Sequence, residues 1–163
     1  MDRVRVSLFN ILLHHDWGNK IGNLFDGKTQ VLDAFCGTGA LGFEALSHGA
    51  AYVTLFDKDM EALSIAKKNA AHLGVEDRCQ ILMADALKPP KADKPCKLIF
   101  LSPPYRKDLI PPALPALDKA GWIADHAVVV AEVEKKESFE VPEGYTLKTS
   151  RTYGIATLHF MIR

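Results

Sequence analysis

The stretch Val31–Gly42, VLDAFCGTGALG, constrains the fold of this chain more than any other. An apolar run leads into a glycine-rich turn, and an apolar helical pattern follows the turn directly. Glycines let the backbone approach a ligand closely, and the first turn of a helix presents free N–H groups. Such a strand–turn–helix unit is typical of α/β folds, which bind ligands beyond the carboxyl ends of parallel strands.

Short apolar runs alternate with helical patterns along most of the chain, and this alternation predicts a parallel sheet. We expect strands over Gln30–Asp33, Ala51–Asp57, Cys79–Ala84, Cys96–Leu101 and His126–Glu134. We expect helices over Leu41–Ser47, Met60–Leu73 and Leu109–Ala120, and an earlier helix that Asp2 could cap.

The end of the chain changes character. The β-rich runs Tyr145–Thr152 and Ile155–Ile162 are separated by little more than Tyr153-Gly154, which favours an antiparallel hairpin at one sheet edge. We therefore expect one α/β domain over residues 1–163. Its sheet should be seven-stranded and mostly parallel, with a C-terminal antiparallel hairpin and helices on both faces.

Composition narrows the class of protein. With 163 residues, 48% of them hydrophobic and 25% charged, the chain is typical of a soluble globular domain. Its net charge is zero, so no strong delocalised attraction to nucleic acid is expected. The three cysteines are odd in number and form no CxxC pair, which indicates reduced thiols and favours no metal site. We expect a cytoplasmic monomer without a membrane span.

The glycine turn has two interpretations. Gly37, Gly39 and Gly42 spell GxGxxG, which makes a dinucleotide site possible. Asp33 at the strand end would repel a pyrophosphate, however, and would attract a ligand with an ammonium and a sulfonium group. S-adenosylmethionine (SAM) is such a ligand. The alternative is that Asp33 only caps the turn by accepting backbone N–H groups.

Two more acids follow strand ends. Asp57 ends the second strand, where a carboxylate can accept both hydroxyls of a ribose. It lies 20 residues past Gly37, a spacing that NAD and SAM sites share. Asp85 follows the third strand and could bind an adenine amino group, although a lone Asp there can be turn chemistry. Parallel strands bring the three acids to one sheet edge, where we expect a nucleoside to bind.

The fourth strand ends in Ser102-Pro103-Pro104-Tyr105. Proline has no N–H, so the Pro103 carbonyl can be a rigid acceptor without a competing donor. With the Ser102 hydroxyl it could hold the hydrogens of an exocyclic base amine and aim its lone pair at a methyl donor. Tyr105 could stack on a flipped base. A strand-ending turn with a core tyrosine is the alternative.

Four stretches of the chain resemble the RsmD family of bacterial 16S rRNA guanine-N2 methyltransferases, in the family's own order. They are Asp2–Leu12, Val31–Ala50, Leu98–Tyr105 and Arg151–Arg163. The resemblance covers almost the whole chain. It implies a class I, SAM-dependent, Rossmann-like methyltransferase that acts on small-subunit rRNA or the assembling 30S subunit, without a metal or a membrane.

The resemblance also implies roles for particular residues. The methionine side of SAM would be lined by Asp33, Phe35, Cys36, Gly37 and Gly39. Its nucleoside side would be held by Asp57, Lys58, Asp85 and Ala86. The guanine would be held by Ser102, Pro103, Pro104 and Tyr105. Residues near the active-site mouth or the substrate would be Arg3, Arg151 and Tyr153.

Two departures from the family pattern keep alternatives open. The family's proline corner begins with Asp or Asn, whereas cytosine-N4 methyltransferases use Ser as this chain does at Ser102. Family members also carry a basic β-hairpin segment before the first helix, and this sequence begins at Met1-Asp2. A cytosine-N4 methyltransferase and a non-catalytic SAM-binding or assembly-associated remnant are therefore the alternatives.

Overall fold

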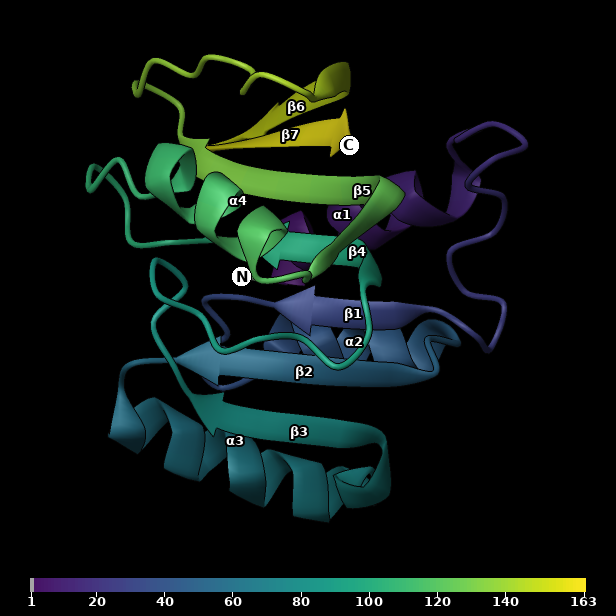
Figure 1. Cartoon of the computed structure of the whole chain (residues 1–163), viewed down its shortest axis with the longest axis vertical. Helices are drawn as coiled ribbons and strands as arrows, with labels where there is room; N and C mark the ends of the chain where they lie inside the picture. Colours follow the sequence, from purple (N-terminus) through teal and green to yellow (C-terminus); the bar gives the residue numbers. More distant parts are fainter. Residues whose placement is uncertain (1) are drawn as a thin grey trace.

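A seven-stranded sheet with the strand order β3-β2-β1-β4-β5-β7-β6 forms the centre of the molecule (Figure 1). The computed structural model describes residues 2–163. The strands are β1 (Gln30–Asp33), β2 (Tyr52–Asp57), β3 (Cys79–Met83), β4 (Cys96–Leu101), β5 (Ile123–Glu134), β6 (Thr146–Tyr153) and β7 (Ala156–Ile162). The helices are α1 (Asp2–His14), α2 (Ala40–His48), α3 (Met60–Leu73), the 3₁₀ turn η1 (Glu76–Arg78) and α4 (Ile110–Lys119).

The pairing directions confirm a mostly parallel sheet with a C-terminal antiparallel hairpin. Strands β1 to β5 pair in parallel, whereas β7 pairs antiparallel with both β5 and β6. Parallel strands end at the same sheet edge, and the reversed hairpin brings its own turn to that edge because Ala156 pairs with Glu134. One edge of the sheet therefore gathers the ends of β1, β2, β4 and β5 together with the β6–β7 turn.

Both faces of the sheet are covered. Helices α1, α2 and α3 pack on one face, and α4 packs on the other (Figure 1). Successive side chains of β5 point to opposite faces of the sheet. Val128 and Val130 pack in the core on the α1 side, and Val129 and Ala131 pack in the core on the α4 side. The segment 84–95 between β3 and β4 contains no helix and crosses the α4 side of the sheet as a loop (Figure 1).

The expected elements are all present; β1, β4 and α3 have the expected bounds, whereas other elements differ at one or both ends. The largest shift is in β5, which begins at Ile123 rather than His126. Cys96 pairs with Ile123 but Leu98 pairs with Val128, so β5 holds three more residues than β4 over this interval. His126 takes up the irregularity with a φ of 63°. The polar residues of this bulge interrupt the apolar pattern, so the sequence does not indicate where the strand starts. The cap expected from Asp2 falls on a side chain outside the described part of the structure.

Candidate functional site

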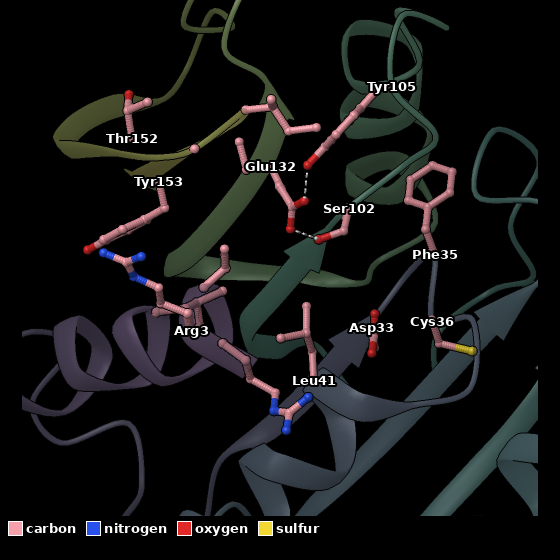
Figure 2. Close-up of a pocket in the computed structure, with 16 residues that line it drawn as sticks. Arg3, Asp33, Phe35, Cys36, Leu41, Ser102, Tyr105, Glu132, Thr152 and Tyr153 are labelled. Carbon is pink, nitrogen blue, oxygen red and sulfur yellow. Dashed lines mark hydrogen bonds between the residues drawn. The ribbon is translucent and has the colours of Figure 1, made fainter. Parts of the chain in front are cut away.

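Two cavities lie at the edge of the sheet where the parallel strands end. The first has a volume of about 680 Å³ and lies between α1, the glycine turn, the proline corner and the β6–β7 turn (Figure 2). The second has a volume of about 650 Å³ and lies between the glycine turn, the end of β2 and the segment after β3. Phe35 and Ser102 line both cavities.

Most residues predicted from the sequence line one of these cavities. The first cavity is lined by Arg3, Asp33, Phe35, Cys36, Ser102, Tyr105 and Tyr153. The second is lined by Phe35, Gly37, Asp57, Lys58, Asp85, Ala86, Ser102, Pro103 and Pro104. Gly39 and Arg151 lie outside both linings.

Asp33 is a buried carboxylate with spare hydrogen-bonding capacity. The residue is 1% exposed, and its Oδ2 accepts the Gly42 N–H at 3.1 Å. Its other oxygen, Oδ1, is buried and has no hydrogen-bond partner among residues 2–163. Burial raises the pKa of Asp33 to about 7, with a smaller contribution from the charge of Asp57. A buried acceptor without a partner is costly, so this site favours a ligand that brings a donor or a positive charge.

Asp57 organises the glycine turn from the end of β2. Its Oδ2 accepts the Gly37 N–H at 2.7 Å, and its Oδ1 accepts the Asp59 N–H at 2.9 Å. Gly37 has a φ of 55°, and a Cβ built on it would meet no atom within 4 Å. The turn is therefore held by the carboxylate while its outer side stays open, which fits close approach of a ligand to the backbone.

Gly39 has a different task from Gly37. It precedes α2 with a φ of 94°, and a Cβ there would lie 2.4 Å from Cε2 of Phe43. The structure therefore explains Gly39 by packing of the turn against the helix, and contact of Gly39 with a cofactor stays a prediction.

The segment after β3 forms the far wall of the second cavity. Asp85 lines this wall, and its Oδ1 accepts the Leu87 N–H at 2.9 Å. This bond is the local turn chemistry that the sequence left open, and it uses one carboxylate oxygen. Ala86 is 2% exposed, whereas Lys58 is exposed at the rim.

The proline corner meets a carboxylate that the sequence reasoning missed. Glu132, on β5, accepts the Tyr105 hydroxyl at 2.5 Å through Oε2 and the Ser102 hydroxyl at 3.5 Å through Oε1 (Figure 2). Burial and this bond to a carboxylate raise the pKa of Tyr105, so its hydroxyl remains a donor. The hydroxyl end of Tyr105 is thus bound to β5, and stacking of its ring on a base stays a prediction.

A signal for Glu132 was present in the sequence. In AVVVAEVE, the end of β5, Val128 and Val130 face the first core, and the same alternation places Glu132 on their side at the strand's carboxyl end. An acid on the buried face of a strand, at its ligand-side end, is the same pattern that identified Asp33 and Asp57.

The loop that follows the corner is fastened to β5. The Arg106 side chain binds both carboxylate oxygens of Glu134, at 2.5 and 2.6 Å, and its backbone N–H donates to Glu137 at 2.7 Å. Arg106 has a φ of 63°, which is a strained value for a side-chain-bearing residue. The fastening holds the loop, and with it Tyr105, against the end of β5.

Of the remaining predicted residues, Arg3, Tyr153 and Cys36 line the first cavity, and Arg151 lies outside its lining. Arg3 comes from α1 and Tyr153 from β6, and both line the cavity (Figure 2). Arg151 is exposed on β6 two residues away. Burial and the neighbouring carboxylates Asp33 and Asp57 raise the pKa of the Cys36 thiol, so a reactive thiolate is not favoured there.

No group of three or more His, Cys, Asp or Glu side chains among residues 2–163 is arranged to hold a metal ion. No helix in that range is long and apolar enough to cross a membrane.

Two relatives of this chain are named as ribosomal RNA methyltransferases. The Haemophilus influenzae ribosomal RNA small subunit methyltransferase D is 31% identical over 96% of this chain and 78% of its own length. The Escherichia coli K12 protein of the same name is 32% identical over 94% of this chain and 73% of its own length.

Solved structures agree on the fold. The Escherichia coli protein yhhF superposes with a TM-score of 0.82 at 32% identity, covering 100% of this chain and 85% of that chain. A Salinibacter ruber RNA methyltransferase, solved in complex with S-adenosyl-L-homocysteine, superposes with a TM-score of 0.70 at 14% identity, covering 99% of this chain and 91% of that chain. The second match shows the class I methyltransferase fold alone.

The match to a protein family spans nearly every residue. The family described as "Conserved hypothetical protein 95" matches residues 1–162. The chain therefore belongs to this family, which is the RsmD family that its sequence resembles.

Proposed function

We propose that this protein is a SAM-dependent methyltransferase that methylates the N2 amine of a guanine in small-subunit (16S) rRNA. The observation that carries the proposal is that Ser102 lines both cavities. With its nucleoside in the second cavity and its ammonium at Asp33 in the first, SAM would bring its methyl group to the junction beside Ser102, where a base amine in the first cavity can meet it. The names of the two curated relatives support rRNA as the substrate.

The chain's residues fit SAM better than a dinucleotide. The buried Asp33 Oδ1, unpartnered among the described residues, suits an ammonium group. Asp57 and Asp85 supply carboxylates beside the second cavity, where ribose hydroxyls and an adenine amine can donate. A pyrophosphate would instead meet the charge of Asp57 at the Gly37 N–H, which that carboxylate already occupies. When bound, SAM supplies an electrophilic methyl group.

The protein's part in the reaction is orientation. The lone pair of an exocyclic base amine is delocalised into the ring, so the amine is a weak nucleophile in its planar form. The Ser102 Oγ and the Pro103 carbonyl are expected to accept the two amine hydrogens and direct the lone pair toward the shared wall of the cavities. Pro103 is buried, and its ring fixes the backbone torsion φ next to this carbonyl.

Incubation with methyl-labelled SAM and unmethylated small ribosomal subunits tests the proposal. The expected product after nuclease digestion is N2-methylguanosine. N4-methylcytidine would instead support the cytosine alternative that Ser102 suggests, and no labelled nucleoside on free or partly assembled rRNA would support a non-catalytic remnant. Titration with SAM and with NAD checks the cofactor, because binding of NAD without SAM would contradict the proposed site.

A further inference from the structure

Glu132 places a carboxylate in the wall of the first cavity, directly after the apolar run 127–131 of β5. Val128 and Val130 are at most 2% exposed and lie in the core on the α1 side of the sheet. Two residues further, Glu132 continues this face and lines the cavity next to Ser102. Ordinary strand chemistry does not require an acid there, since β5 pairs with β7 through backbone atoms.

The neighbours of the Glu132 carboxylate orient it but leave some of its hydrogen-bond acceptor positions free. It accepts the hydroxyls of Tyr105 and Ser102, one on each oxygen. An ionised carboxylate can accept about four hydrogen bonds, so about two acceptor positions remain. Both donors are neutral hydroxyls, which fix the carboxylate without cancelling its charge. Its free positions are therefore available to donors that enter the cavity.

Guanine offers the donor pattern that matches such a carboxylate. On its Watson–Crick edge the N2 amine lies beside the protonated ring nitrogen N1, so two N–H groups point the same way. In cytosine and adenine the ring nitrogen beside the amine carries a lone pair, which a carboxylate would repel. Flipped bases are commonly recognised through this edge.

We propose that Glu132 is the specificity residue of the site and accepts the N1–H of the target guanine, next to the amine held by Ser102. The inference rests on the proposed function and deepens it. It assigns base selection to β5 rather than to the proline corner. Ser102 can then orient an amine on more than one base without making the enzyme a cytosine methyltransferase.

In this arrangement Tyr105 is a positioning residue. Its hydroxyl holds Oε2 of Glu132 at 2.5 Å, and its loop is fastened to β5 through Arg106 and Glu134. The competing explanation is structural: Glu132 would exist only to anchor Tyr105. The two explanations differ in what happens to base preference when the carboxylate becomes an amide.

The test uses small subunits reconstituted with rRNA that carries guanine or 2-aminopurine at the methylated nucleotide. Both bases present a 2-amine, but 2-aminopurine lacks the 6-oxo group and its N1 is an acceptor instead of a donor. Wild-type protein should prefer guanine by about 10- to 100-fold in kcat/KM, the range expected for one hydrogen bond to a charged group. Glu132→Gln offers one acceptor and one donor, so this preference should vanish or reverse. RNA affinity measured without SAM should show the same change in preference.

Two variants serve as controls. Glu134→Gln makes the same chemical change two residues along the strand, outside the first cavity. It weakens the fastening of the Arg106 loop, so turnover should fall, but it should keep the preference for guanine. Tyr105→Phe removes the anchoring hydroxyl but keeps the carboxylate, so turnover should fall while the preference stays.

The outcomes separate the possibilities. An unchanged preference in Glu132→Gln, with turnover reduced as in Tyr105→Phe, overturns the inference in favour of simple anchoring. If Glu132→Gln does not fold, the wild-type comparison decides: equal kcat/KM on the two bases overturns the inference, and a tenfold or larger preference supports it. Formation of N2-methylguanosine without base discrimination would defeat this inference alone, whereas absence of that product would defeat the proposed function.

Discussion

The ionisation of Asp33 should make SAM binding depend on pH. Burial raises the pKa of this carboxyl from 3.8 to about 7, so in the free protein it is largely protonated under mildly acidic conditions. The ammonium group of SAM is best accommodated by the ionised form, whose Oδ1 is free of partners among residues 2–163. Binding below pH 7 must therefore expel a proton, and the affinity should fall as the pH falls through the pKa.

The size of the effect follows from the pKa. With a pKa of about 7, Asp33 is about half ionised at pH 7 and about 3% ionised at pH 5.5. The dissociation constant for SAM should therefore rise about 16-fold between these pH values, which corresponds to about 1.6 kcal/mol. About one proton should be released per SAM bound at pH 5.5. The window stays below neutrality so that the ligand's own ammonium remains charged.

Isothermal titration calorimetry measures both quantities, because repeating the titration in buffers of different ionisation enthalpy counts the protons released. Asp33→Asn is the matched control: it keeps an acceptor for the Gly42 N–H but cannot ionise, so it should bind SAM more weakly and without this pH dependence. Equal wild-type affinity at pH 5.5 and 7, with no proton release, would refute the reasoning. It would mean that Asp33 is not the group that meets the ammonium.

Four further substitutions test other parts of the site. Ser102→Ala should lower kcat by about 10- to 100-fold and leave the dissociation constant for SAM unchanged. An equal loss of SAM affinity would show that Ser102 contacts the cofactor rather than orienting the amine. Gly39→Ala should lower the free energy of unfolding in urea by about 2–4 kcal/mol, because the new Cβ would clash with the Phe43 ring and the backbone there has a positive φ. Gly37→Ala should lower it by about 1 kcal/mol, because the space around Gly37 is open. Asp57→Asn should weaken SAM binding about tenfold or more, measured by titration, since it removes the charge and one of two backbone acceptors.

Sequence reasoning found the parts of the site that strand ends dictate. Asp33 and Asp57 could be located because a parallel sheet brings its carboxyl ends to one edge whatever the details of packing. Glu132 escaped because its strand is the one that pairs with the antiparallel hairpin, so its end was not counted with the others. The start of β5 was misplaced for a related reason, since the bulge at His126 fits neither the strand nor the turn pattern. Gly39 shows that a glycine in a ligand-binding motif can be required by packing, because the Phe43 ring lies against it, rather than by contact with a ligand.

The crossing segment 84–95 should set the local stability of the cofactor side of the molecule. It covers its part of the sheet as a loop, over a cavity of about 450 Å³. Its middle is tied to the protein by the Trp122 indole N–H, which donates to the Pro90 carbonyl at 2.7 Å, and by the Ala92 N–H, which donates to Ala120 at 2.9 Å. Segments with few buried contacts open by sub-global fluctuations at a lower free energy than the strands beneath them. Because Asp85 and Ala86 begin this segment, part of the free energy of nucleoside binding should go into closing it, and amide hydrogen exchange there should slow when the ligand binds.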